Sequence, residues 1–491
     1  MKTRTLKQLV LYNYRYIFGY SIIVLLAIYF LGWRLGSLVP GLAPQELVAT
    51  ANHVSLQSFS ELPLAPLHGI LQYIITQIFG FSAATVRLPS VLLAAATMTT
   101  LYFLLKKWFG RPTALMGGAL IISADWFLHF ARFGTGSIEF SFWVSFGLLS
   151  LTKVLERKSL WLLSFALAIT ALLFVPFGPY ASLTLLLSLL GYKVFRGRMH
   201  EVSTPIKAVC YLIVLLGLSG AIALSVINIE FAKQLLVIQD LPTIQKYFVN
   251  IFINTGSVVA MLPNANPIVS TTSVAVIRFF ELIFILFGVA MLFKTRVNRL
   301  NLTAIILSVV LVAVSGLSGN DAAAGLMIVP TAIFMTAGIR HLIHRWKRTF
   351  PNNPYARIMA YMPLAVLFIC VVLVHYVSYF RLWASQTDVQ QVFSVDSRLA
   401  VAKLNDTSLE NKDCFVETDN ASEQAFISAS QTVCRPIYID ATLEDRQSAA
   451  VLLVRPASPL INNNQLQPSY PLVSTTRDQN VRWLVVNHNN N

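Results

Sequence analysis

Charged side chains are scarce in this sequence. Asp, Glu, Lys and Arg together make up 12% of its 491 residues, whereas apolar residues make up 56%. A soluble globular chain carries about 25% charged residues. This composition therefore excludes a soluble globular protein. Apolar runs close to the length that crosses a membrane as a helix, about 20 residues, recur along the chain. We predict eleven transmembrane helices, at 16–33, 83–105, 112–130, 139–152, 160–175, 177–195, 208–228, 274–293, 302–318, 322–340 and 359–380.

Acidic residues are fewer than basic ones, 22 against 37. Lys and Arg gather on the cytoplasmic side of membrane proteins, and here 22 of the 37 fall in alternate connections of the predicted helices. We therefore predict a multi-pass protein of the cell membrane, with a cytoplasmic N-terminus and residues 382–491 outside the cytoplasm. The net charge of +15 then reflects topology and contact with anionic lipid rather than a nucleic-acid partner.

Cysteine is also rare, with four residues and no Cys-x-x-Cys pair that would indicate a structural metal site. Cys210 and Cys370 lie inside apolar runs. Cys414 and Cys434 lie in the tail, where an oxidising compartment favours a disulfide between them. Two free thiols are the alternative.

The remaining pattern divides the chain into two predicted domains. Residues 1–381 form an all-α membrane bundle with two long outer loops, 34–82 and 229–273. The first loop contains a predicted short helix at 42–49 and an amphipathic helix at 66–75. Long, patterned loops on one side of a bundle favour a site there. Residues 382–491 form a small α/β or β-rich domain, because short apolar runs at 414–416, 436–439, 451–454 and 483–486 alternate with polar turns.

Three motifs then follow one another: ATVRLPS at 84–90, KWFGR at 107–111 and WFLHFAR at 126–132. Together with the long first loop, they resemble the membrane glycosyltransferases of family 39, which include protein O-mannosyltransferases and aminoarabinose transferases and have the C-type membrane fold. The resemblance covers residues 30–160. It implies a polyprenyl-phosphate sugar as donor and an acceptor, whether protein, lipid or glycan, on the non-cytoplasmic face.

The same resemblance implies site residues. The first loop of the family carries an Asp-Glu pair whose Asp acts at the acceptor or the reacting centre, and the matching pair here is Gln45-Glu46. A second family acid follows the Arg that ends the third helix, and Glu139 follows Arg132 here. Displacement of a polyprenyl phosphate needs a carboxylate to accept or orient a proton. We therefore predict Glu46 and Glu139 as catalytic residues and Gln45 as a substrate ligand.

The departing phosphate needs cations or hydrogen-bond donors. Candidates on the predicted outer side are Arg87, Arg132, Arg278, Lys246 and His68. Simpler roles remain open for these residues: interfacial anchors that keep their charge at the membrane surface, or an i,i+3 ion pair between Arg278 and Glu281.

Glu46 and Glu139 also have a simpler role open to them, since each lies in the first turn of a predicted helix and would complement its dipole. A divalent metal held by His53, His68 and His129 with Glu61 is a further alternative, against the simpler role of histidines that only stabilise the structure at the interface.

The sequence thus predicts a membrane glycosyltransferase. Gln45 in the place of the family Asp leaves open a degenerate relative that binds lipid-linked sugar without transferring it. A transporter or flippase of lipid-linked saccharides is the third hypothesis. Transporters favour interrupted helices and polar sites near the midplane, whereas most acids of this bundle lie towards one face.

Overall fold

A computed structural model gives the fold of the chain. It describes residues 6–39, 41–46, 49, 64–156, 158–192, 202–238, 242–259, 275–295, 299–318, 321–350, 354–393, 400–401, 403–405, 412–417, 424, 427, 433–438, 451–454, 470–473 and 481–487. The chain divides into two compact units. The bundle unit is Met1–Trp33, Leu56–Ile70 and Pro89–Tyr379, and the tail unit is Arg34–Ser55, Leu71–Leu88 and Phe380–Asn491. The predicted domain boundary after residue 381 stays a prediction.

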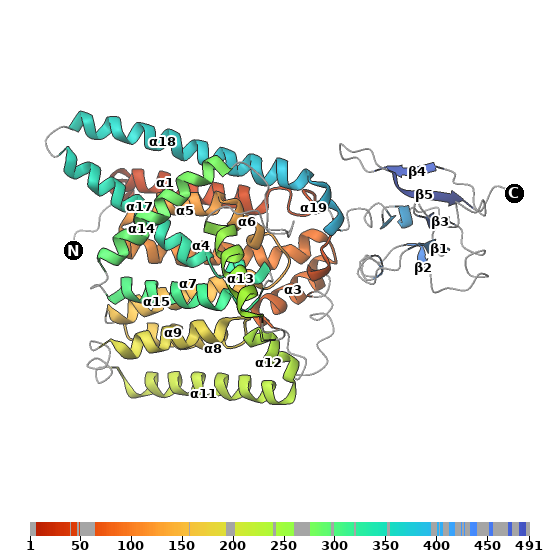
Figure 1. Ribbon diagram of the computed structural model, residues 1–491, viewed down its shortest axis with the longest axis horizontal. Coiled ribbons are helices and arrows are strands. Elements are labelled where there is room, and N and C mark those ends of the chain that lie inside the picture. Colours follow the sequence, from red (N-terminus) through yellow and green to blue (C-terminus); the bar gives the residue numbers. More distant parts are fainter. Residues whose placement is uncertain are drawn as a thin grey trace. The chain divides into compact units, whose positions relative to one another are not determined.

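Helices make up the bundle unit, and several of them run side by side in Figure 1. Their bounds are α1 Leu6–Gly32, α3 Pro66–Phe79, α4 Ala83–Phe109, α5 Arg111–Ser123, α6 Asp125–Ala131, α7 Ser137–Leu155, α8 Trp161–Leu172, α9 Gly178–Gly191, α11 Thr204–Ile227, α12 Ile229–Leu236, α13 Ile244–Val259, α14 Ala275–Lys294, α15 Arg299–Ser315, α16 Asp321–Gly325, α17 Ile328–Thr349 and α18 Pro354–Val377. The first residues of α4 and the last of α3 belong to the tail unit.

Each of the eleven predicted runs overlaps at least one of these helices. Five described helices are long and apolar enough to span a membrane, or six if α5 and α6, which meet at a bend of 66°, form one span. Four further helices are apolar but shorter: α8, α9 and the segments Phe18–Gly32 and Leu300–Ser315. The predicted apolar runs are thus confirmed as helical. The number of helices that cross the membrane stays a prediction.

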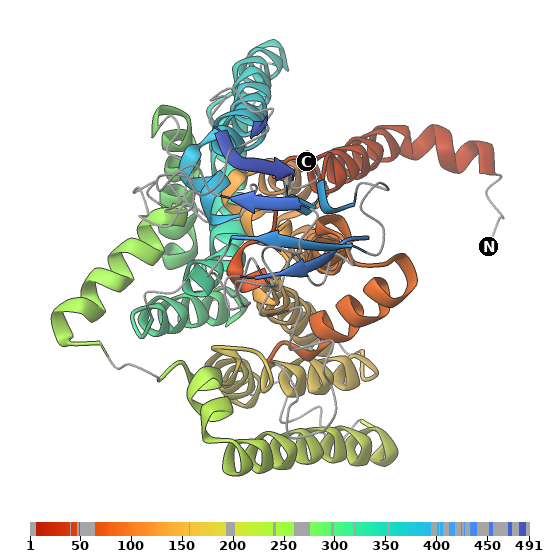
Figure 2. The ribbon, with the colours of Figure 1, turned by 90° about the vertical axis from the view of Figure 1, so that its right-hand side faces the viewer.

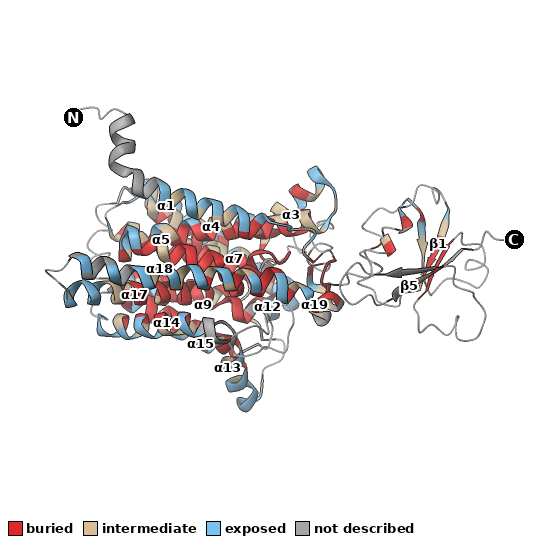
Figure 3. Ribbon diagram, turned by 90° about the horizontal axis from the view of Figure 1, so that it is seen from above, coloured by how far each residue is buried: buried red, intermediate tan, exposed pale blue. Residues whose placement is uncertain are grey.

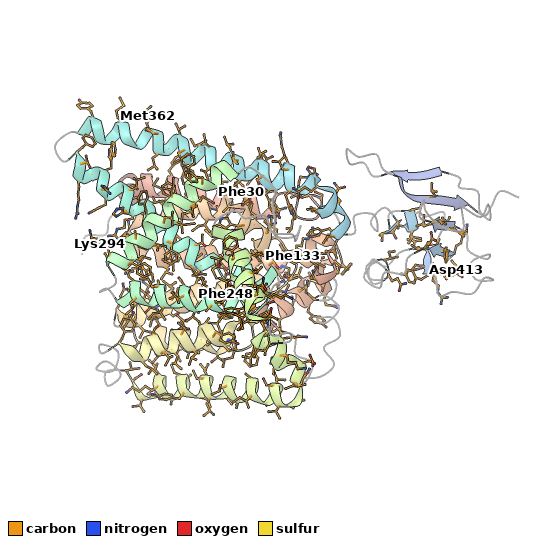
Figure 4. The ribbon with its side chains drawn as sticks, viewed as in Figure 1. Phe30, Phe133, Phe248, Lys294, Met362 and Asp413 are labelled. Carbon is orange, nitrogen blue, oxygen red and sulfur yellow. A yellow bond between two sulfur atoms is a disulfide. The ribbon has the colours of Figure 1, made fainter. Side chains whose placement is uncertain are left out.

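The outward faces of the bundle suit lipid. Only 28% of the apolar window in Met362–Ser385, which begins in α18, and 22% of that in α11 is buried. Figure 3 shows exposed residues along α18. Met362 of α18, labelled in Figure 4, is 68% exposed. Apolar side chains on these faces gain nothing from contact with water, so a lipid environment accounts for them.

Two glycines allow α14 and α17 to pack backbone against backbone. A Cβ atom at Gly288 of α14 would clash with the carbonyl of Phe334, and one at Gly338 of α17 would clash with the carbonyl of Phe284. Small residues at such crossings let membrane helices approach closely. The position of α14 is therefore fixed by α17.

The tail unit contains a five-stranded sheet, whose strands Figure 2 shows side by side. The strands are β1 Asp413–Val416, β2 Arg435–Ile437, β3 Val451–Val454, β4 Tyr470–Val473 and β5 Val481–Asn487, in the order β2-β1-β3-β5-β4. β1 is parallel to β2 and β3, whereas β5 is antiparallel to β3 and β4. Four strands were predicted. β4 was missed because its second residue is Pro471, and proline, like Pro436 of β2, is tolerated on an edge strand.

The core of the tail unit joins the sheet to the first predicted loop. Leu42 and Val86 belong to the same buried apolar cluster as Cys414, Cys434 and the strand residues Val416, Val451, Leu453 and Val485. Cys414 and Cys434, the predicted pair, form a disulfide within this cluster. The bond closes a loop of 20 residues in sequence and so restricts the unfolded chain.

Candidate active site

The predicted residues Glu46 and Arg87 form a buried ion pair in the tail unit. Arg87 Nε lies 2.8 Å from Glu46 Oε1, and its Nη2 lies 3.0 Å from Oε2. Both side chains are buried, with exposures of 3% for Arg87 and 0% for Glu46. Such a two-point contact matches the planar guanidinium to the carboxylate. Both oxygens of the Glu46 carboxylate are thus held by Arg87.

Arg87 also fixes the backbone of the first predicted loop. Its guanidinium donates hydrogen bonds to the carbonyls of Val39 and Gly41, each at 2.7 Å, and of Leu35 at 3.3 Å. Its Cζ atom lies 5.3 Å from the ring centre of Phe393, a cation–π contact. Arg87 therefore holds the backbone of this loop in one conformation.

The short helical turn that carries Gln45 and Glu46 is held at its start by Glu46. The backbone N–H of Ala43 donates to Glu46 Oε2 at 3.0 Å, and the N–H of Glu46 donates to the Ala43 carbonyl at 2.9 Å. Of the predicted helix at 42–49, the structure describes residues 44–46 and 49 as helical. Gln45, at the position of the family Asp, is exposed.

Glu139 lies in the first turn of α7, in the bundle unit, and is 1% exposed. Its carboxylate accepts hydrogen bonds from the backbone N–H groups of Leu67, at 3.3 Å, and His68, at 2.7 Å, in the first turn of α3. Trp143 Nε1 donates to it at 3.0 Å. The first N–H groups of a helix have no partner within the helix, and Pro66 has no N–H group at all. The Glu139 carboxylate accepts from the next two, those of Leu67 and His68. Glu139 thus ties α3 to α7.

His68 extends this contact through its ring. Nε2 of His68 lies 2.9 Å from Ser90 Oγ, and Ser90 Oγ donates to the Thr135 carbonyl at 3.1 Å. A hydroxyl has one proton, so Ser90 accepts from Nε2 of His68. The segment before α7 is thereby joined to α3 and α4.

A cavity of about 170 Å³ lies next to these residues in the bundle unit. Its lining is mostly apolar: Leu64, Ala65, Gly136, Ser137, Phe140, Val175, Pro176, Phe177 and Leu326. Ala65 and Phe177 both have left-handed backbones, with φ of 59° and 63°, a conformation that costs energy for residues other than glycine and occurs often at functional sites. An apolar cavity of about 150 Å³ accommodates a molecule the size of benzene, so this one has room for a small apolar group.

Arg132 ends α6 and is 4% exposed. It donates to the carbonyls of Phe30 and Trp33, both at 2.7 Å, and its Cζ lies 5.5 Å from the ring centre of Tyr379. Phe30, on α1, is labelled in Figure 4. Arg132 therefore joins α6 to the end of α1 and to the segment after α18.

The other candidates differ in their surroundings. Lys246 of α13 is exposed, and Arg278 is in α14 with a side chain that lies outside the described residues. Oε1 of Glu281, the predicted ion-pair partner of Arg278, lies 3.0 Å from Nε2 of His375. The ion pair with Arg278 stays a prediction. No group of three His, Cys, Asp or Glu side chains among the described residues is arranged to hold a metal, and His53 and Glu61 lie outside that part of the chain.

Two buried residues were missed by the sequence analysis. Asp125 and His375 lie inside the predicted helices 112–130 and 359–380 and contact each other in the bundle. Ionisable residues within membrane helices usually face the protein interior and often serve a function. A search of the apolar runs for such residues would have found both.

Comparison with known proteins gives a family likeness for part of the chain. Residues 63–223, about a third of the chain, match the family model described as dolichyl-phosphate-mannose-protein mannosyltransferase. That segment contains Arg87, Arg132, Glu139 and His68, whereas Gln45 and Glu46 precede it. No curated protein matches the sequence.

The fold is similar to that of ArnT from Cupriavidus metallidurans. The structure of that protein in the apo state gives a TM-score of 0.54 at 13% identity, over 96% of this chain and 97% of ArnT. Its structure bound to undecaprenyl phosphate gives a TM-score of 0.56 at 13% identity, over 97% of this chain and 98% of ArnT. At this identity the likeness concerns the fold, the C-type glycosyltransferase fold that the sequence predicted. The predicted resemblance to the family 39 membrane glycosyltransferases is therefore confirmed, by the family model over residues 63–223 and by the fold over nearly the whole chain.

Proposed function

We propose that this protein is a membrane glycosyltransferase that takes a sugar from a polyprenyl-phosphate donor and transfers it to an acceptor on the non-cytoplasmic face. The observation that carries the proposal is the likeness, over nearly the whole chain, to ArnT bound to undecaprenyl phosphate. The mannosyltransferase family model supports the same reaction class. The face rests on the alternation of basic connections along the sequence.

Within this reaction, we assign Glu46 and Arg87 to the support of the site. Both oxygens of Glu46 contact Arg87, and Arg87 holds three carbonyls of the loop. The neighbouring Gln45 is exposed and is the side chain that the loop offers to a substrate. An amide donates and accepts hydrogen bonds but does not take up a proton. Gln45 therefore orients the acceptor, and a base, where the reaction needs one, comes from elsewhere.

The donor end of the reaction needs a cation for phosphate and space for an apolar tail. Among the predicted cations whose side chains the structure describes, Lys246 is exposed, whereas Arg87 and Arg132 are buried against backbone carbonyls. Lys246 is therefore the candidate that remains accessible to a phosphate. The apolar cavity beside Ser137 has the size and chemistry to take a branched hydrocarbon unit.

The proposal is tested with purified protein in lipid nanodiscs and a panel of radiolabelled polyprenyl-phosphate sugars. We expect one donor to be turned over, by transfer or by hydrolysis, and Gln45→Ala to lower the rate about tenfold, the loss of one orienting contact to a reacting group. Gln45→Asp restores the family pair and should equal or exceed the wild-type rate. Gln234→Asp, at an exposed glutamine of α12, is the matched control and should leave the rate unchanged.

A second candidate function has one observation in its favour, the exposed Gln45 at the position of the family Asp. A degenerate relative would bind a labelled donor without turnover in every variant, and turnover that appears only in Gln45→Asp would identify that case. Labelled donor that crosses the bilayer of liposomes, again without turnover, would replace the proposal by a flippase.

A further inference from the structure

The last turns of α17, in the bundle unit, concentrate positive charge. Six side chains that carry or can gain a positive charge lie within the segment 340–348: Arg340, His341, His344, Arg345, Lys347 and Arg348. From His344 onward these side chains are exposed, as the end of α17 in Figure 3 shows. Residues 322–387, which include all of α17 and α18, contain no Asp or Glu. No acid of either helix therefore neutralises this charge.

The same turns separate the charge from an apolar face. At 3.6 residues per turn, the six basic side chains fall on one half of the helix, and Leu342, Ile343 and Trp346 fall on the other. Trp346 is 37% exposed, and its ring centre lies 4.9 Å from that of Phe350, which follows the helix. A helix with Lys and Arg on one face and Trp with aliphatic residues on the other suits the boundary between lipid headgroups and acyl chains.

The turn between α4 and α5 brings a second basic segment to the same place. Arg340 Nη1 donates a hydrogen bond to the carbonyl of Trp108, a contact between residues 232 apart in sequence. The Cζ atom of Arg340 lies 5.9 Å from the ring centre of Phe109, a cation–π contact. Lys106 and Arg111 flank these two aromatic residues in sequence. The basic face of α17 thus begins at a turn that carries further cations.

The protein itself supplies little counter-charge to this surface. Within the described part of the chain, Arg345, Lys347 and Arg348 form no ion pair. In the α4–α5 turn, Glu156 Oε1 lies 3.0 Å from Nζ of Lys107 and so neutralises that lysine. Like charges on neighbouring turns repel one another, so the surface favours an anion from outside the protein.

We propose that the basic face of α17 over residues 340–348, with Lys106 and Arg111 of the α4–α5 turn, binds the phosphate groups of anionic glycerophospholipids. Arginine presents a fork of donors that matches phosphate oxygens, and Trp346 on the opposite face lies against the acyl chains. Basic clusters at the end of a membrane helix bind anionic lipid in this way. Topology accounts for the sign of these charges, whereas a binding site accounts for their gathering on one face. The inference goes beyond glycosyl transfer and does not depend on it.

The first test measures the lipid preference of the full-length protein. Native mass spectrometry counts the lipids retained from mixed micelles with equal amounts of phosphatidylglycerol and phosphatidylcholine. We expect the wild type to prefer phosphatidylglycerol about tenfold, and the double variant Arg345→Gln with Arg348→Gln to lose most of that preference. The control, Lys158→Gln with Lys207→Gln, removes two cations on the same predicted side of the membrane, and it should keep the preference. A wild type without preference, or an equal loss in both double variants, would overturn the inference.

The second test locates the lipid at Trp346 in nanodiscs. Bromine atoms on acyl chains quench tryptophan fluorescence on contact, and the difference between the wild type and Trp346→Phe isolates the signal of Trp346. At equal mole fractions, we expect brominated phosphatidylglycerol to quench this signal about twofold more than brominated phosphatidylcholine, because the basic face enriches the anionic lipid. Equal quenching by the two lipids would contradict the proposal. Retention of a polyprenyl phosphate in preference to phosphatidylglycerol, lost in the Arg345 and Arg348 variant, would assign this face to the donor instead and likewise overturn it.

Discussion

The two units each contain a buried cluster of ionisable side chains, and the clusters differ in their basic residue. In the tail unit the cation is Arg87, which contacts one carboxylate and three backbone carbonyls. In the bundle unit the basic residue is His375, which lies within 3.4 Å of carboxylate oxygens on two other helices. Arginine stays charged at every physiological pH and presents a rigid fork of donors, whereas histidine gains or loses a proton. The first cluster therefore fixes a backbone shape, and the second is able to respond.

The difference bears on the proposed site. Arg87 is always charged and holds the backbone of the loop by hydrogen bonds. The loop therefore keeps its exposed residue, Gln45, in one place, as a substrate ligand requires. A cluster of side chains between helices holds elements together and releases them when its charge changes. Four substitutions break or sharpen this comparison, in descending order of expected effect.

Arg87→Met gives the largest effect. It leaves the Glu46 carboxylate buried without its cation and removes donors from the carbonyls of Val39 and Gly41. Loss of one partner of a buried pair costs about 3–5 kcal/mol. We expect the free energy of unfolding, measured by urea titration in mixed micelles, to fall by that amount. The double variant Arg87→Met with Glu46→Met should recover part of the loss, because no charge is then left buried. A single variant as stable as the wild type would contradict the role of Arg87.

Removal of the disulfide comes next. Cys414→Ser with Cys434→Ser should destabilise the tail unit by about 3 kcal/mol, because the unfolded chain regains the freedom of the closed loop. The disulfide lies in the same cluster as Leu42 and Val86, so hydrogen exchange should rise around residues 42–46 as well as in β1. Cys370→Ser, a free thiol, is the control. If exchange rises in β1 alone, the sheet and the Glu46–Arg87 loop are energetically independent.

Gly338→Ala tests the bundle cluster through its support. The added methyl group meets the Phe284 carbonyl of α14, and overpacking of this kind costs about 1–3 kcal/mol. We expect lower stability and a weakened contact between Glu281 and His375, read from the ¹⁵N signal of His375. Gly220→Ala is the control, because a Cβ atom there has its nearest neighbour at 3.7 Å. A stable Gly338→Ala variant with an unchanged histidine signal would show that α14 does not depend on this crossing.

The sequence predicted the helices of the bundle well because apolar runs and their lengths are local properties. Every predicted run overlaps a helix. The break at Ala124 and the shift from α16 to α17 were not visible, since each depends on contacts between helices rather than on the run itself. In the tail, Pro471 hid β4, because an edge position that tolerates proline is set by the order of strands.

The candidate site was predictable as a set of residues but not as a set of contacts. Glu46, Arg87 and Glu139 were all identified, yet the pairing of Glu46 with Arg87 joins residues 41 apart, and that of Glu139 with the start of α3 spans 71. Pairings at such distances depend on the tertiary fold. Their catalytic roles stay predictions. Asp125 and His375 were missed because the search for acids was confined to the predicted outer connections.

Glu139→Gln is expected to have the smallest effect. It distinguishes a Glu139 that only positions α3 from a Glu139 that takes part in the reaction. The amide keeps one oxygen for the N–H of His68, but its nitrogen cannot accept from Leu67 or from Trp143. The two lost contacts and the lost charge at two helix starts together cost about 2 kcal/mol. We expect faster amide exchange in the first turn of α3 while the rest of the bundle is unchanged. Turnover that falls tenfold or less would fit a carboxylate that only positions α3, whereas a loss of a hundredfold or more with α3 intact would assign Glu139 to the chemistry itself.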